Sequence, residues 1–425
     1  MFAKILHIDK PRFGFGTVRL YFQPLPIVWG ATAALLLSLF IYLDYLGFQP
    51  TLPVRVLESL CALAGFAILL LLDRRALFWG GFFTGLLWFY WIAFSFRYYD
   101  VAWLIPFMIL FVALSYGLFF WLIGLFSHPL PRALALLGFS YFHPLSFNWF
   151  IPELTLIHTF FGITKWQFAL FLLGLSLLLS LPRWWKLLAI PLLAFAIDKD
   201  YDRHLPLPAA KVMLTDSHVD QAKKWDEAYL PETIENNITT ILEASSEGYD
   251  MVVLNESVFP MFLNTDLNLT KRLIDISHDI VIVAGALYSD GAHAYNSTYY
   301  FDHGKLYIAN KVILVPFGEE IPLPKFLAKI INKIFYNGAE DYKTAKKPVD
   351  LKLSTGEFRN AICFEATRDE LFVNHPKAMI AISNNAWFTP SIEPTLQKLL
   401  LEYFSRKYGT VIYHSANMGI SKVIH

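Results

Sequence analysis

"DKDYDRHLPLPAA", residues 198–210, divides the chain into two parts of different composition. Long apolar runs come before it, and short apolar runs that alternate with helix-like polar segments come after it. The 425-residue chain is 56% hydrophobic and 17% aromatic, and only 16% of its residues are charged. Soluble globular proteins carry more charge than this, so we expect the first part of the chain to lie in a membrane.

Seven apolar runs precede this boundary. A helix needs about 20 apolar residues to cross the hydrocarbon core of a bilayer, and most of the runs reach that length. The last run is short, and the fifth is interrupted by Pro144. We therefore predict a transmembrane domain over residues 1–205 with about seven helices. Their expected positions are 26–47, 54–72, 76–96, 101–126, 133–151, 166–182 and 184–197.

Basic residues are distributed unevenly over the loops between these runs. They are frequent before the first run and after the second, fourth and sixth. The positive-inside rule then places the N-terminus in the cytoplasm. With seven spans, everything after Ile197 lies on the outer face of the membrane, and a miscount by one span would reverse that side. The basic residues that decide the orientation are Lys4, Lys10, Arg12, Arg19, Arg74, Arg75, Arg132, Arg183 and Lys186.

The second part of the chain, residues 206–425, alternates strand-like and helix-like segments. "AKVMLT" (210–215), "YDMVVLNES" (249–257) and "DIVIVAGALY" (279–288) have strand character, and "PETIENNITTILEAS" (231–245) has helical spacing. We also expect a hairpin-like pair of strands over 296–317, where "KVILVPF" (311–317) forms the second half. Strands interleaved with helices predict a layered α/β domain.

Three polar residues are expected at the ends of these strands. Glu256 ends one strand, Lys311 opens another, and Cys363 ends "FRNAIC". In α/β sheets, ligands and catalytic groups gather where strands end. A cation favours the thiolate form of a cysteine, a carboxylate can take its proton, and a lysine can also stabilise an oxyanion. Each residue also has a structural explanation: a buried core cysteine, a solvated lysine and a glutamate in a turn.

Composition excludes several other classes of site. The formal net charge is zero, which gives no argument for nucleic-acid binding. The two cysteines, Cys61 and Cys363, lie far apart and form no CxxC motif, so neither a disulfide framework nor a zinc site is indicated. The predicted spans carry few charges, and these lie near span ends, which disfavours a channel or a transporter.

Several segments resemble the nitrilase superfamily, and with the membrane part they resemble its membrane-embedded branch, the apolipoprotein N-acyltransferases. "KVILVPFGEEIP" (311–322), which contains the LVPFGE motif, and "ICFE" (362–365) carry the most specific similarity. The resemblance covers essentially the whole chain, weakly in its first part. The other similar segments are "QAKKWD" (221–226), "NESVFP" (255–260), "YNSTYYF" (295–301), "SNNAWF" (383–388) and "SANMGIS" (415–421).

The resemblance implies an αββα-type sandwich that transfers an acyl chain from a phospholipid to the N-terminal amine of a diacylglyceryl-cysteine lipoprotein. Cys363 would carry the acyl group as a thioester, Glu256 would be the general base, and Lys311 would stabilise the oxyanion. Glu319 and Glu365 match two further glutamates of the family. The reaction needs no cofactor or metal, and the implied location is the bacterial inner membrane, with the catalytic domain on the periplasmic face.

Apolar segments near these motifs indicate a lipid substrate. "PKFLAKIINKIF" (324–335) has Phe326 and Ile330 on one helical face and lysines on another, which is typical of a helix on a membrane surface. The same segment could instead pack on its own domain. Trp387 and Phe388 could contact acyl chains or belong to the core.

The sequence also departs from the family. Asn384-Asn385 stands where Asn-Asp is usual, and Phe364 stands where Tyr often follows the cysteine. The chain stops at "MGISKVIH", so the catalytic domain is expected to be short at its C-terminus. Two alternatives therefore stay open: a membrane-anchored amidase that releases its thioester to water, and an inactive truncated homologue.

Overall fold

The computed structural model describes residues 20–199, 201, 205–316, 318–320 and 342–425. The chain divides into two compact units. One unit is helical and ends at residue 203. The other contains residues 204–425 together with two short segments from earlier in the chain, 98–100 and 145–147.

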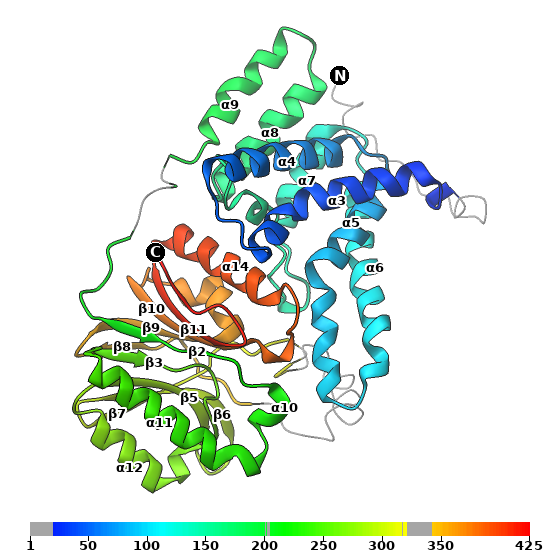
Figure 1. Cartoon of the computed structure of the whole chain (residues 1–425). Coiled ribbons are helices and arrows are strands. Elements are labelled where there is room, and N and C mark those ends of the chain that lie inside the picture. The colour runs from blue at the N-terminus through cyan, green and yellow to red at the C-terminus, as the bar shows by residue number, and fades with distance from the viewer. Residues whose placement is uncertain (1–19, 200, 202–204, 317, 321–341) are drawn as a thin grey trace. The chain divides into compact units, whose positions relative to one another are not determined.

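The helical unit is built from apolar helices, several of which begin with a proline in their first turn (Figure 1). Within the described residues, four helical stretches are long and apolar enough to cross a membrane: 24–45, 52–71, 74–98 and 102–123. Shorter apolar helices follow them. The helices are α3 (Pro24–Tyr45), α4 (Leu52–Leu71), α5 (Arg74–Phe89), α6 (Ile105–Ile123), α7 (Pro129–Phe139), α8 (Lys165–Ser180) and α9 (Ala189–Phe195).

The fifth predicted span differs most from the structure. Helix α7 ends at Phe139, and the residues up to 151 contain no further α-helix. Pro144 lies in this stretch, and Leu145 and Ser146 adopt left-handed backbone conformations with φ of 53° and 62°. Neither conformation can continue an α-helix, so the apolar run from 133 to 151 is helical only at its start.

The second unit contains two six-stranded sheets. In the first, the strand order is β1-β3-β5-β6-β7, with β4 paired to β5; in the second it is β12-β11-β10-β9-β8, with β2 paired to β11. The first-sheet strands are β1 (Val212–Leu214), β3 (Met251–Val253), β4 (Phe259–Phe262), β5 (Val281–Ser289), β6 (Ala294–Asp302) and β7 (Lys305–Asn310). The second-sheet strands are β2 (Asp216–Ser217), β8 (Asp350–Leu353), β9 (Gly356–Ile362), β10 (Ala378–Asn384), β11 (Val411–Asn417) and β12 (Lys422–Ile424).

Helices cover the outer faces of the two sheets, which confirms the predicted αββα arrangement (Figure 1). Helices α11 (Leu230–Ser246) and α12 (Leu267–Ile276) pack on the first sheet through residues such as Ile241 and Leu273, both fully buried. A second apolar cluster lies between the sheets and joins side chains such as Val253 and Ile380. Helix α14 (Glu393–Tyr408) packs on the second sheet.

Residues 311–316 correct one strand prediction. Strand β7 ends at Asn310, so Lys311 follows a strand and does not open one. The backbone N–H groups of Val312 and Ile313 donate to the carboxylate of Glu365, over 2.7 and 2.9 Å, and not to a neighbouring strand. The apolar composition that favoured a strand here therefore belongs to an irregular segment whose backbone groups are satisfied by a side chain.

Candidate active site

Lys311 is almost completely buried, with 1% of its surface exposed. Its ammonium nitrogen lies 2.6 Å from Oε2 of Glu319 and 3.8 Å from Oε1 of Glu256. Its backbone N–H donates to the carbonyl oxygen of Asn296, over 2.9 Å, which fixes the start of the segment against β6. A buried ammonium between two carboxyl groups is a fixed positive charge that water does not screen.

Glu256 follows strand β3 and is 6% exposed. The side-chain amide of Asn296 donates both to Oε1 of Glu256, over 2.8 Å, and to Oε1 of Glu319, over 3.0 Å. Strand β5 passes close behind it at Gly285, where an added Cβ would lie 2.7 Å from Cα of Glu256 and 2.5 Å from the backbone nitrogen of Ser257. Only a glycine allows this approach, so β5 sets the position of the Glu256 backbone.

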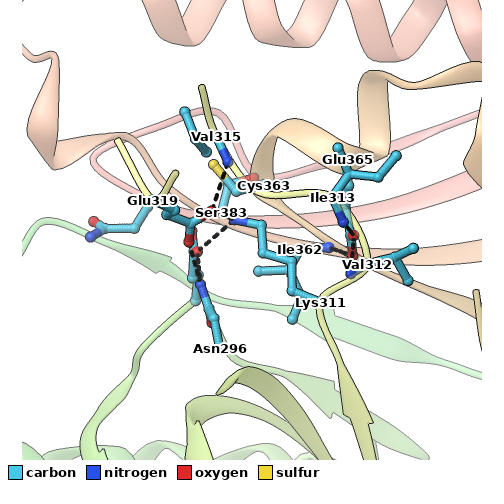
Figure 2. A network of polar contacts seen from close by, with 12 residues as sticks. Asn296, Lys311, Val312, Ile313, Val315, Glu319, Ile362, Cys363, Glu365 and Ser383 are labelled. Carbon is cyan, nitrogen blue, oxygen red and sulfur yellow. Dashed lines mark hydrogen bonds and ion pairs between the residues drawn. The ribbon is translucent and has the colours of Figure 1, made fainter. Parts of the chain in front are cut away.

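Cys363 comes directly after β9, at the start of the 3₁₀ turn Cys363–Thr367. Its φ of 56° lies in the left-handed region, which is rare for a residue with a side chain. The turn sends the side chain out of the strand direction and leaves it half-buried. Figure 2 shows Cys363 converging with Lys311 and Glu319, which both belong to the segment that follows strand β7.

Glu365 lies two residues beyond the cysteine and is fully buried. One oxygen accepts from the N–H groups of Val312 and Ile313, and the other accepts from the N–H of Ile362, over 2.9 Å. Glu365 therefore ties the lysine segment to the end of β9 (Figure 2). Glu319 closes the same segment on itself, because its Oε2 accepts from the N–H of Val315 over 2.9 Å.

The buried charges change the acidities of these groups. Burial raises the pKa of the Cys363 thiol well above its usual value, Glu256 raises it further, and Lys311 opposes both. Burial also raises the pKa of Glu256, again against Lys311. Burial lowers the pKa of Lys311, but Glu319 and Glu256 outweigh that effect and hold the pKa above its usual value. The resting site thus holds a protonated thiol, a carboxyl group of increased basicity and a permanent cation.

Lys224 is a site neighbour to which the sequence assigned no role. It belongs to helix α10 (Gln221–Lys224), is 5% exposed, and its ammonium donates to the carbonyl oxygen of Glu256 over 2.7 Å. Burial lowers its pKa to about 7, although Glu256 raises it. "QAKKWD" was the only sequence signal for this contact, and it carried no information about which side chain turns inward.

The structure describes two of the four predicted lipid-contacting residues. Trp387 and Phe388 are half-buried beyond the end of β10. The Trp387 ring stacks on Tyr99, which belongs to the same unit, with ring centres 5.8 Å apart. Phe326 and Ile330 lie outside the described residues.

The class of protein follows from this architecture. Two packed sheets covered by helices, preceded in the chain by apolar helices, make this a membrane protein with an α/β sandwich domain. Among solved structures, a CN-hydrolase superfamily protein from Xanthomonas campestris is 12% identical and covers 51% of this chain and 79% of its own, with a TM-score of 0.37. The NitFhit protein of C. elegans is 15% identical; the match covers 50% of this chain and 52% of the NitFhit chain, with a TM-score of 0.38.

Sequence relatives identify the family. Residues 26–199 match the apolipoprotein N-acyltransferase integral membrane domain. An apolipoprotein N-acyltransferase from Wolinella succinogenes is 42% identical over 406 residues, which cover 95% of this chain and 97% of that protein. Another, from Helicobacter hepaticus, is 38% identical and covers 87% of this chain and 94% of its own. The chain therefore belongs to the apolipoprotein N-acyltransferase family of integral membrane enzymes, as its motifs indicated.

Proposed function

We propose that this chain transfers an acyl group from a phospholipid to the N-terminal amine of a diacylated lipoprotein, through a thioester on Cys363. The observation that carries the proposal is the convergence of a strained, half-buried cysteine with a basic carboxyl group and a buried ammonium. Membership of the family supports the acyl acceptor, and the apolar helical unit supports a donor that lies in the membrane.

In the first half-reaction, Glu256 takes the proton of the Cys363 thiol as the sulfur attacks the ester carbonyl of the phospholipid. The carbonyl oxygen becomes an oxyanion, which the Lys311 ammonium stabilises. The intermediate then collapses, the bond to the glycerol oxygen breaks, and Glu256 returns the proton to that oxygen. A lysophospholipid leaves, and the acyl group remains on the sulfur.

In the second half-reaction, the N-terminal amine of the lipoprotein attacks the thioester carbonyl. Glu256 accepts a proton from the attacking nitrogen, and Lys311 again stabilises the oxyanion. Breaking the carbon–sulfur bond forms the amide and releases the thiolate, which recovers its proton from Glu256. The raised pKa of the Cys363 thiol favours the final proton transfer, which returns the free enzyme to a neutral thiol.

The side of the membrane is also part of the proposal. The distribution of basic residues favours a cytoplasmic N-terminus, and an odd number of spans before the catalytic domain places that domain in the periplasm, against the inner membrane. To check this orientation, a cysteine is introduced on the catalytic domain of the Cys61→Ser variant, and intact cells are treated with a membrane-impermeant maleimide. We expect the introduced cysteine to be labelled in intact cells. Labelling only after the inner membrane is broken would place the domain in the cytoplasm.

The acyl thioester gives the direct test of the reaction. The detergent-purified protein is incubated with phospholipid, and its intact mass is measured beside Cys363→Ala. We expect a hydroxylamine-sensitive acyl adduct on the unmodified chain, none on the variant, and discharge of the adduct by a diacylated lipopeptide. Discharge by water at the same rate with and without the lipopeptide would support an amidase, and no adduct with any phospholipid would contradict the proposal.

A further inference from the structure

A second group of buried polar side chains lies next to Cys363 and has no part in the chemistry above. Asn385 follows strand β10, and Glu393 and Gln397 lie one turn apart on helix α14. Each of the three is 1% exposed. Buried polar groups cost free energy unless they are paired, so their mutual arrangement is informative.

The three side chains form a chain of contacts that ends at the sulfur. The side-chain nitrogen of Asn385 lies 2.9 and 2.8 Å from the two carboxyl oxygens of Glu393, and 2.9 Å from Oε1 of Gln397. The other end of the Gln397 amide, Nε2, lies 4.0 Å from Sγ of Cys363, at the far end of the range for a hydrogen bond to sulfur.

The structure gives this chain of contacts a direction. The NH₂ end of the Asn385 amide faces both carboxyl oxygens of Glu393, and the carbonyl oxygen of that group accepts from it whether Glu393 is ionised or protonated. The same NH₂ then faces Gln397, which must present its oxygen. The remaining NH₂ of Gln397 is therefore directed at the sulfur, and turning this amide over would place two donors face to face at Asn385.

We infer that Gln397 is a further residue of the acyl-transfer site, whose side-chain N–H donates to the Cys363 sulfur when it is a thiolate, and that Asn385 and Glu393 position it. The inference rests on the proposed nucleophilic role of Cys363. A hydrogen bond from an amide to an anionic sulfur is stronger than one to a neutral thioester, so Gln397 stabilises the charged form of the sulfur selectively.

The donor also has a clear task among the charged neighbours. Glu256, Glu393 and Glu319 all disfavour a negative sulfur, and Lys311 favours it. Lys311 is shared with two carboxyl groups, at 2.6 and 3.8 Å. A neutral donor adds stabilisation to the thiolate without adding a charge that would have to be buried.

The test measures the reactivity of the thiol and does not depend on acyl transfer. In a Cys61→Ser background, Cys363 is alkylated with iodoacetamide across a range of pH, and the modified fraction is followed by intact mass. For Gln397→Met, which keeps the length of the side chain and removes the donor, we expect the thiol pKa to rise by about one unit, which is roughly a tenfold slower alkylation below that pKa. An unchanged pH profile would overturn the inference.

A matched control and a double variant separate this role from a purely structural one. Gln221→Met removes another buried amide, which accepts from Asn384 over 2.8 Å, and should leave the pH profile unchanged. Asn385→Leu should raise the thiol pKa when Gln397 is present and add nothing in the Gln397→Met background. Additive shifts would show that the residues act separately and would contradict the positioning role. If the chain without any substitution formed no acyl adduct with phospholipid, that result would contradict the proposed function and not the role of Gln397 toward the thiol.

Discussion

Two regions lie beside Cys363, and they act on its sulfur by different means. The lysine segment, residues 311–320, contributes an ammonium and a carboxylate in direct ionic contact. The amide cluster, Asn385, Glu393 and Gln397, contributes hydrogen bonds and no cation. The first region supplies charge for the chemical steps, whereas the second directs a donor. This contrast predicts that substitutions in the lysine segment cause large losses of acyl-adduct formation. Substitutions in the amide cluster should cause smaller effects, mainly on the acidity of the Cys363 thiol.

The largest effect is expected for Lys311→Met. It removes the only cation that the described residues place beside both Glu256 and Glu319. The oxyanion then loses the ammonium that stabilises it, and the two carboxyl groups lose the positive charge between them. Formation of the acyl adduct should slow by about a thousandfold or more. Single-turnover mass measurements check this, with circular dichroism to confirm folding. A folded variant that forms the adduct within tenfold of the normal rate would remove Lys311 from the chemistry.

Gly285→Ala tests the backbone position of Glu256. The new methyl group would lie within 2.8 Å of three backbone atoms of residues 255–257, so either β5 or the glutamate must move. We expect roughly a hundredfold slower adduct formation, because a shift of about 1 Å at a reacting group costs that much. Gly138→Ala is the control, since an added Cβ there meets no atom within 4 Å. Equal effects of the two changes would contradict the argument.

Glu365→Gln tests the connection between the lysine segment and β9. Glutamine offers one oxygen to three backbone donors and turns its NH₂ toward the others. We expect a loss of about 1–3 kcal/mol in stability and a tenfold to hundredfold slower reaction. Thermal unfolding and adduct formation are measured together. A variant that unfolds at the normal temperature would show that the lysine segment holds its position without this carboxylate.

The smallest effect concerns pH and the amide cluster. Burial raises the pKa of Glu393 to about 8, from 4.5, although Asn385 lowers it. The unfolded chain releases this proton at lower pH than the folded chain does, so the free energy of unfolding should fall as pH rises from about 4.5 to 8. Glu393→Gln should flatten that decline, most clearly between pH 7 and 8, above the pKa of about 7 to which burial raises Glu365. Parallel curves for the two proteins would refute the assignment.

The sequence predicted the layers of the fold and the position of Cys363 better than it predicted the lysine segment and the amide cluster. Cys363 was expected at a strand end and lies directly after β9, whereas Glu256, expected to end its strand, lies three residues beyond β3. Lys311 was expected to open a strand, since apolar composition does not reveal that a distant carboxylate will take the backbone N–H groups.

The amide cluster left almost no trace in the sequence. Asn385 stood out only as a departure from a usual aspartate, and Gln397 is one polar residue within a helix. Their roles depend on which amide end faces which acceptor, and that is decided by the packing of α14 on the second sheet. Hydrogen-bond direction is a property of the folded structure and has no periodicity that a sequence could display.

The contact between Glu365 and the lysine segment has a consequence for evolution. The carboxylate holds the N–H groups of Val312 and Ile313, which every amino acid except proline possesses. Mutation can therefore exchange these two side chains for others of similar size without moving Lys311. We therefore expect related sequences to diverge more at these two positions than at Glu365, which makes both contacts.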